Sequence, residues 1–230
     1  MSDQFVTIPE TTLPGGLVVP AFRVGRYVCT KDKTGKAAVT AEGTPWVNVS
    51  FTEAKAACHR AGYALITESQ ALALAYHIAA QDANWTGSKV GKGKLYQGLR
   101  KWTVRSAQPG TFKPTDPDEQ RQFFVTGKDS IFDAAGNVFT WVFDDVQGDK
   151  NGLIAKAFAK DSPSLVIPYP AEDKGQGWLP QAGSDWSGGA LIRGGCWDSG
   201  ANAGAFYLGS GWPGYRVGDV GFRCTTQPGL

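Results

Sequence analysis

The chain of 230 residues contains only two histidines and one methionine, and no stretch of it approaches the ~18 consecutive apolar residues of a membrane span. His59 and His77 lie on separate predicted helices, and neither has a second histidine four residues on or a glutamate spaced for chelation. Zinc and iron centres usually need several such ligands. We therefore expect no metal site, no cofactor and no membrane insertion.

Cysteine is scarce and widely spaced. Cys29, Cys58, Cys196 and Cys224 include no Cys-x-x-Cys pair of the kind found in zinc or redox sites. Two alternatives stay open from the spacing alone, namely four buried thiols or a long-range disulfide.

A large excess of basic charge is also missing, because the formal net charge is +2 and charged residues make up 19%. Nucleic-acid-binding proteins normally carry a clustered basic excess, so no nucleic-acid partner is expected. A local basic cluster over 89–105 precedes an acidic run at 116–119. This pattern favours a solvated face with some charge pairing over an anion-binding patch. Residues 1–20 lack the pattern of a secretory signal peptide, so a cytoplasmic or virion-associated location is expected.

Two short patterns that suggest ligand sites do not fit their structural contexts. Gly209–Gly214 matches G-x-G-x-x-G, but Pro213 and the residues after it do not predict the helix that a dinucleotide site requires. The oxygen-rich segment 144–152 lacks EF-hand spacing, so a polar turn is favoured over bound Ca²⁺. Gly-x-Ser-x-Gly is absent, and we expect no catalytic residues.

Glycine and tryptophan, in contrast, are abundant, with 30 and eight copies. This composition is typical of a loop-rich fold in which large aromatic side chains fill an irregular core. Ser50 with Glu53, and Thr67 with Gln70, form capping boxes ahead of apolar residues at helical spacing. They predict helices over 52–61 and 68–80.

The remaining pattern predicts short strands at 22–28, 46–49, 191–193 and 220–223, and a turn at Gly136-Asn137 followed by a strand within 131–145. No linker interrupts the body of the chain. We therefore expect residues 1–20 to form an N-terminal extended arm and residues 21–230 a single domain. The fold class is α+β, with two early helices, short antiparallel strands and long loops.

Four segments, taken in order, resemble formylglycine-generating-enzyme-like domains. Residues 46–68 resemble the first helix block of that superfamily, 131–142 its central "GNVWEW" strand, 191–197 its "RGGSW" strand and 221–223 its terminal "GFR". Together they cover roughly residues 27–224. The resemblance implies a C-type-lectin-like fold.

Residues 193–197, 200–206 and 221–224 are similar to one branch, the variable proteins of diversity-generating retroelements. In that family a reverse transcriptase with adenine-directed errors rewrites the codons of this segment, and members act as phage receptor-binding proteins or surface-displayed binders. The resemblance implies a variable region at about 196–219 that contacts an unknown protein or cell-surface ligand. The expected ligand-binding positions are Asp198, Ser199, Ala201, Tyr207, Gly209, Ser210, Trp212, Tyr215, Arg216 and Asp219.

The composition of this segment agrees with that interpretation. Tyr, Trp, Arg, Ser and Gly are common in binding loops because they combine rigid contact area with adaptable hydrogen bonding. Lys, Glu, Gln and Met are absent from 196–224, and changes in the first two bases of an AAY codon cannot produce them. Such codons cannot produce Trp either, so Trp212 is expected to be fixed. The intervening framework is expected to be buried or critical to the backbone: Gly194, Gly195, Trp197, Gly204, Phe206, Gly221 and Phe222.

Two alternative functions have weaker support. An oxidoreductase of the formylglycine-generating type needs a cysteine pair after the "RGGSW" strand, but here Cys196 replaces the serine and the next cysteine is Cys224. A calcium-dependent lectin would carry Glu-Pro-Asn, Gln-Pro-Asp or Trp-Asn-Asp, and none occurs. In long C-type lectin domains a disulfide ties the first helix to the last strand, so Cys58 and Cys224 are expected to be neighbours. Whether they are bonded depends on the compartment.

Overall fold

A computed structural model describes residues 4–169 and 172–227 of the chain, and its two α-helices lie early in the sequence. Helix α1 spans Phe51–Arg60 and helix α2 spans Glu68–Ala79. Each begins at its expected capping box: the Ser50 hydroxyl accepts from the Glu53 amide at 3.3 Å, and the Glu53 carboxylate accepts from the Ser50 amide at 2.9 Å. Both predicted helices are confirmed, with bounds that differ by one residue.

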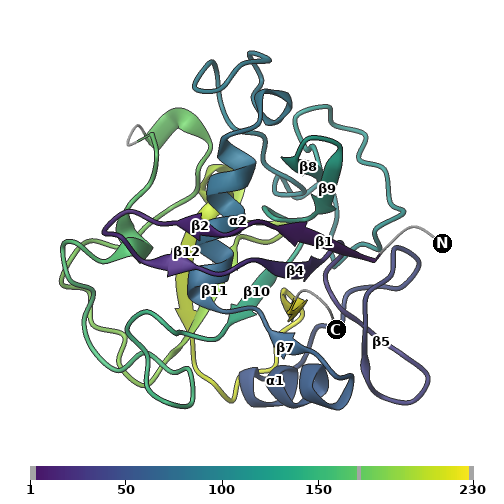
Figure 1. The fold of residues 1–230 in the computed structure, drawn as a ribbon. Coiled ribbons are helices and arrows are strands. Elements are labelled where there is room, and N and C mark those ends of the chain that lie inside the picture. The colour runs from purple at the N-terminus through teal and green to yellow at the C-terminus, as the bar shows by residue number, and fades with distance from the viewer. Residues whose placement is uncertain (1–3, 170–171, 228–230) are drawn as a thin grey trace.

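Most strands belong to two four-stranded sheets, and Figure 1 shows their arrangement. The first sheet is antiparallel, in the order β1 (Phe5–Ile8), β4 (Phe22–Gly25), β14 (Cys224–Thr226) and β7 (Ala64–Leu65). The second has the order β12 (Gly204–Gly211), β11 (Ala190–Gly194), β10 (Phe139–Val142) and β13 (Val220–Phe222). Its β10–β13 pair is parallel and its other pairs are antiparallel.

Within the described residues, three small hairpins and four short 3-10 helices complete the fold. The hairpins are β2 (Thr11–Thr12) with β3 (Val18–Val19), β5 (Thr30–Lys31) with β6 (Ala37–Ala38), and β8 (Gln122–Thr126) with β9 (Asp129–Phe132). The 3-10 helices are η1 (Asp82–Asn84), η2 (Pro163–Leu165), η3 (Glu172–Lys174) and η4 (Gly200–Asn202). Long loops therefore join most of the elements, as expected.

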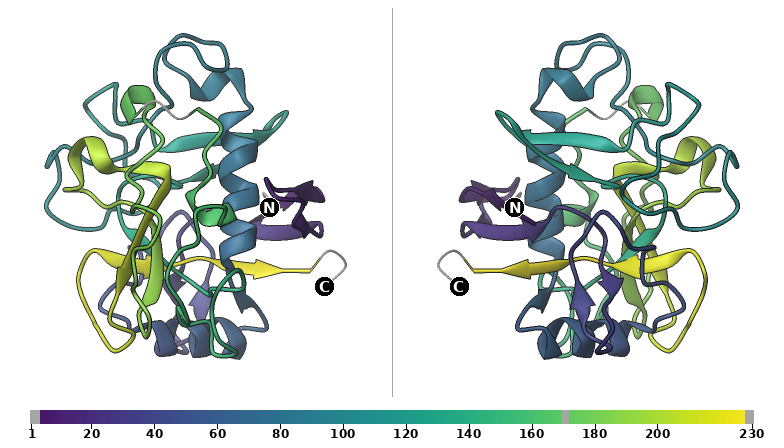
Figure 2. Two further views of the ribbon diagram at one scale, coloured as in Figure 1. Left: turned by 90° about the vertical axis from the view of Figure 1, so that its left-hand side faces the viewer. Right: turned by 90° about the vertical axis from the view of Figure 1, so that its right-hand side faces the viewer.

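Helix α2 lies between the N-terminal strands and the second sheet, as Figure 2 shows from two sides. Its Leu72 and Ile78 are buried in one core cluster with Ile8 of β1 and Phe206 of β12. The first 20 residues were expected to form an extended arm, and the described part of that segment is largely extended and packs on the body through β1 and the β2–β3 hairpin.

A buried ion pair joins α2 to the second sheet. Glu68 is the first residue of α2, and its carboxylate accepts two hydrogen bonds from the Arg193 guanidinium on β11, one of them at 2.8 Å. Arg193 also donates to the main-chain oxygen of Phe206 at 2.9 Å. The arginine of the "RGGSW"-like segment therefore fixes the helix against both β11 and β12.

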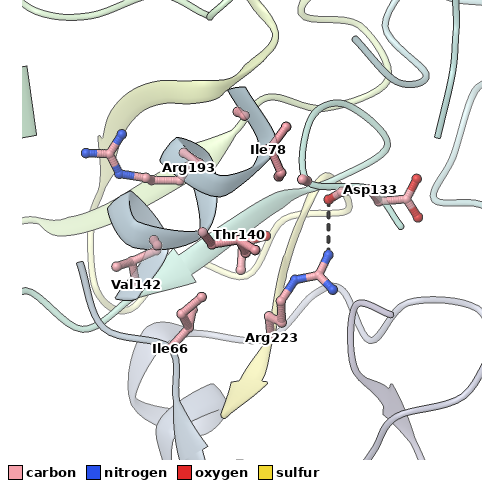
Figure 3. A pocket seen from close by; sticks show the side chains of 12 residues that line it. Ile66, Ile78, Asp133, Thr140, Val142, Arg193 and Arg223 are labelled. Atoms are coloured by element: carbon pink, nitrogen blue, oxygen red, sulfur yellow. Dashed lines mark hydrogen bonds between the residues drawn. The ribbon is translucent and has the colours of Figure 1, made fainter. Parts of the chain in front are cut away.

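A second buried guanidinium lies where the last strand passes from one sheet to the other. Arg223 separates β13 from β14 and donates to the main-chain oxygens of Gly25, Phe132 and Asp133. Figure 3 shows the Asp133 contact beside a small cavity between α2 and the sheet. That cavity has a volume of about 30 Å³, room for little more than one or two water molecules.

The predicted turn at Gly136-Asn137 is confirmed, since both residues have positive φ, 72° and 65°. The buried Asn137 side chain accepts from the Gln108 amide at 2.8 Å and donates to Asp133 at 3.1 Å. Asp133 in turn forms a buried, two-bonded pair with Arg121. The "GN" of the central motif therefore organises a polar network that holds the long loop before β8.

The predicted strand at 46–49 is wrong, because this segment forms no strand. Asn48 has a φ of 55°, which breaks an extended run. The amide of Trp46 donates to Cys29 and that of Asn48 to Val217, so the segment is held by two separate loops. The strand expected over 22–28 is shorter than predicted and ends at Gly25.

The expected proximity of Cys58 and Cys224 is confirmed by a distance of 2.9 Å between their sulfur atoms. A third cysteine, Cys29, lies 3.1 Å from Cys224 and was not foreseen as part of this group. All three are fully buried. Hydrogen bonds with both neighbours, together with burial, raise the pKa of the Cys224 thiol. Whether Cys58 and Cys224 form a disulfide depends on the redox state of the compartment, and this stays a prediction.

The Glu68–Arg193 pair leads to the first prediction. Replacing Glu68 by Ala leaves a buried guanidinium without its partner, so the free energy of unfolding should fall by about 3–5 kcal/mol. Urea denaturation followed by circular dichroism measures this loss. Arg216→Ala is the control, because its pair with Glu53 is solvent-exposed and the loss of that pair should matter much less. Equal losses in the two variants would contradict a special role for the buried pair.

Candidate functional site

The C-terminal loop region is built on glycines that approach other main-chain segments closely. Gly194 and Gly195 follow one another with φ values of 95° and 85°, which favour glycine. A Cβ at Gly195 would lie 2.8 Å from Ala203, and a Cβ at Gly204 would overlap the main chain of Gln176 and Gly177. These glycines fix the path of the chain into β12.

Two neighbouring aromatic side chains on β12 lie in different environments. Phe206 is fully buried and packs edge-on against Tyr76 of α2, with ring centroids 5.2 Å apart. Tyr207 points the other way, is half-buried, and lies between Phe139 and Trp178 at centroid distances of 5.2 and 6.0 Å. Strand β12 is therefore anchored in the core through Phe206, while Tyr207 joins an aromatic group with Phe139 and Trp178.

Three predicted site residues meet around Cys196, just after β11. The Cys196 thiol donates to Asp198 at 2.9 Å and lies 3.8 Å from the Asp219 carboxylate. The Ser199 hydroxyl accepts from the Cys196 amide at 2.8 Å. Asp198 and Asp219 also line a cleft of about 650 Å³, together with Trp197 and Asn48.

The environment of Cys196 does not activate its thiol. Burial, followed by the hydrogen bond to Asp198, raises its pKa to about 12. A thiol with such a pKa is protonated at neutral pH and is a poor nucleophile. Its hydrogen bonds go to oxygen atoms, whereas the other three cysteines form a separate group.

The loop between β12 and β13 carries the most exposed aromatic side chains of the predicted site. Trp212 is 64% exposed and Tyr215 is 59% exposed. The loop nevertheless has anchors, because Pro213 accepts from the amide of Phe51 and Val217 from that of Asn48. Arg216 forms a two-bonded pair with Glu53 at 2.8 and 2.9 Å. Exposed side chains thus extend from a tethered main chain.

Of the ten predicted positions, Ala201, Trp212, Tyr215 and Arg216 are exposed, and Asp198, Ser199, Tyr207, Ser210 and Asp219 are partly exposed. Gly209 is buried, so its expected exposure is wrong. A Cβ there would lie 3.0 Å from the Tyr207 ring and 3.2 Å from Ile192. Ile192 is the residue of β11 that pairs with Gly209 in the sheet. The G-x-G-x-x-G pattern lies on β12 and the turn after it, with no helix at its end.

Most of the expected framework is buried, but Trp197 is only partly buried. Phe206, Phe222 and Gly204 are buried, and Trp197 packs edge-on against Trp102 at 4.9 Å. Two features escaped the sequence argument. Glu53, recognised only as a capping residue, also binds Arg216, and Trp178 with Trp186 lines a second cleft near η4. Only the high tryptophan content hinted at the second feature.

The acidic turn at 144–152 uses its carboxylates within the protein. Asp144 accepts from the amides of Val146 and Gln147 at 3.0 Å, and Asp149 accepts from those of Asn151 and Leu153. Within residues 4–169 and 172–227, no group of three or more His, Cys, Asp or Glu side chains is arranged to hold a metal ion. No helix in these ranges is long and apolar enough to cross a membrane.

Framework and loop residues should differ in their effect on stability. Phe206→Ala removes a fully buried ring and should cost about 3–5 kcal/mol. Trp212→Ala removes a mostly exposed ring and should change the free energy of unfolding by no more than about 0.5 kcal/mol. Urea unfolding of both variants tests this. A large loss in Trp212→Ala would show that this side chain supports the loop.

Asp219 should make stability depend on pH. Burial, followed by the charge of Asp198, raises its pKa, so the folded protein holds this proton more tightly than the unfolded chain. The contribution of the protonated Asp219 carboxyl to stability is fully present below the pKa of about 3.9 in the unfolded chain. It is lost as the pH rises through the higher pKa of the folded protein. Asp219→Asn should therefore stabilise the protein near pH 7 and leave it unchanged near pH 3. Urea midpoints at both values measure this, and a loss of stability near pH 7 would contradict it.

The chain matches the family model described as the sulfatase-modifying factor enzyme 1-like domain over residues 23–228. No curated protein sequence matches it. Among solved structures, CarF is 12% identical with a TM-score of 0.53, and the match covers 97% of this chain and 98% of CarF. This likeness shows the fold alone.

Treponema denticola variable protein 1 is 17% identical with a TM-score of 0.47, and the match covers 98% of this chain and 94% of that one. The Major Tropism Determinant M1 variant is 13% identical with a TM-score of 0.45, and the match covers 98% of this chain and 55% of that one. The α+β fold predicted from the motifs, of the C-type-lectin-like kind, is confirmed. Since the family model spans nearly all of the described residues, the chain belongs to the family of sulfatase-modifying factor enzyme 1-like domains.

Proposed function

We propose that this protein is a binding protein whose C-terminal region, residues 196–219, contacts a protein or cell-surface ligand. The observation that carries the proposal is the contrast within this region. Trp212 and Tyr215 are largely exposed, whereas Phe206, a few residues earlier, is fully buried. A rigid scaffold that presents large exposed aromatics is the arrangement expected of a binding surface.

The chemistry of the exposed residues supports the proposal. Trp, Tyr and Arg contribute most of the energy at many interfaces, and Trp212, Tyr215 and Arg216 lie within one short loop. The tethers at Pro213 and Val217 reduce the conformational entropy that the loop loses on binding. Asp198, Ser199 and Asp219 add hydrogen-bonding groups at the cleft near Cys196.

We further propose that codon changes of the retroelement type diversify this surface. The resemblance of the motifs, and the absence of Lys, Glu, Gln and Met from 196–224, support this reading. The framework glycines would then be invariant, and Trp212 would be a fixed contact. Residues 21–230 would act as one domain with residues 1–20 as its arm, in the cytoplasm or on a virus particle.

Catalysis of the formylglycine-generating type has less support. That chemistry relies on two reactive cysteines just after the "RGGSW" strand. Cys196 lies there without a second cysteine nearby, and its thiol instead contacts Asp198 and Ser199 and has a raised pKa. The proposal is therefore a binder that uses an enzyme-like fold without the catalytic pair.

The genome provides the most direct test of diversification. A near-identical, adenine-rich copy of the segment that encodes residues 196–224 should lie beside a reverse-transcriptase gene, and differences between the copies should fall at adenine positions. A genome with neither element would remove the retroelement from the proposal.

A display library tests the binding scaffold itself. Randomising Asp198, Ser210, Tyr215, Arg216 and Asp219 together should give mostly folded variants, judged by thermal melting and protease resistance, because these side chains are at least partly exposed. A matched library at Gly195, Gly204, Phe206, Leu208 and Phe222 should give mostly unfolded variants, because these positions are buried. Similar folded fractions in the two libraries would contradict the division into framework and surface.

A further inference from the structure

A second cleft, outside the predicted site apart from Ala201, lies between the segment 176–186 and η4. Its volume is about 710 Å³, within the range typical of small-molecule sites. None of the described residues that line it is charged, and they include Gln176, Trp178, Gln181, Ser184, Trp186 and Asn202. A ligand that depends on charge pairing therefore has no partner here.

The main-chain contacts of Trp178 hold it in place. Its amide donates to Asn202 and its main-chain oxygen accepts from Leu208, both at 3.0 Å, so the segment lies along the edge of β12. Gly177 is required at this approach, because a Cβ there would lie 2.5 Å from the Tyr207 amide nitrogen. The main chain that carries the indole is thus held in place without a ligand.

Trp178 and Trp186 form an aromatic platform in the cleft. Their ring centroids are 6.3 Å apart with an angle of 22° between the planes, and Phe158 supports Trp186 edge-on at 5.3 Å. The Trp178 side chain remains 44% exposed. A flat, supported and exposed indole suits an apolar ring face that stacks on it.

Polar groups accompany this platform. Gln181, Ser184 and Asn202 contribute amide and hydroxyl groups that are exposed or partly exposed. Gln176 is only 2% exposed, and its side-chain oxygen accepts no hydrogen bond from any residue that the structure describes. An unpaired buried acceptor of this kind costs free energy unless some donor reaches it.

We propose that this cleft binds a neutral carbohydrate. A sugar ring has an apolar C–H face, which would stack on Trp178, and a rim of hydroxyls, which would bond to Gln181, Ser184 and Asn202. The absence of charged lining residues disfavours phosphates, carboxylates and amines, and the amide groups disfavour a purely apolar ligand. The proposal goes beyond the display function, since it involves none of the exposed side chains of the 212–218 loop.

Ligand-observed NMR and intrinsic tryptophan fluorescence provide the test, with maltotriose, cellotriose and fully N-acetylated chitotriose as neutral probes and octaproline as the competing peptide. At least one trisaccharide should bind saturably. Trp178→Ala should weaken it at least about tenfold, which corresponds to about 1.4 kcal/mol. Trp102→Ala is the matched control, because Trp102 is 49% exposed but does not line this cleft, and it should leave binding unchanged.

A second variant separates a loss of binding from a loss of folding. Asn202→Ala alters an exposed side chain and should also weaken the sugar while the melting temperature stays unchanged. Binding of octaproline alone, no saturable binding of any trisaccharide, or equal effects of Trp178→Ala and Trp102→Ala would overturn the proposal. Trp212→Ala should not affect sugar binding, so failure of the display function and failure of this site are distinguishable.

Discussion

The buried guanidinium of Arg223 is the contact on which both sheets depend. It lies at the point where the last strand leaves the second sheet and enters the first, and it donates to carbonyl oxygens of Gly25, Phe132 and Asp133. These oxygens belong to segments far apart in sequence. Removing the guanidinium would leave them without that donor in the interior, which is costly. Burial lowers the pKa of Arg223, which shows the price of placing this charge there.

The motifs that identify the family have structural roles of the same kind. Arg193 of the "RGGSW"-like segment holds α2, Asn137 of the "GN" pair organises a polar turn, and Arg223 of "GFR" joins the sheets. Each is a buried polar contact with little freedom to change. The exposed loop between β12 and β13, in contrast, is held mainly by main-chain hydrogen bonds and by the exposed Arg216–Glu53 pair.

The sequence predicted what depends on local signals. Both helices were predicted from capping boxes, in which the N-cap residue pairs with the residue three positions later. The framework of the site was predicted from the glycines and aromatic residues of the motifs. Two-residue strands such as β2 and β5 are too short for any periodicity, and the strand expected at 46–49 fails because of the positive φ at Asn48. The burial of Gly209, the third cysteine and the Trp178 cleft arise from long-range packing, which no local pattern encodes.

The parallel pairing of β13 with β10 has a consequence for the loop after β12. Because β11 is antiparallel to both β10 and β12, strands β12 and β13 run in the same direction, and the connection must travel back along the sheet while crossing two intervening strands. Strand spacing puts that path at roughly 20 Å, against a maximum reach of about 30 Å for the extended segment 212–219 and its links to the two strands. Little slack remains. Deletions in this loop are therefore restricted, because a shorter connection could not span the path between the two strands.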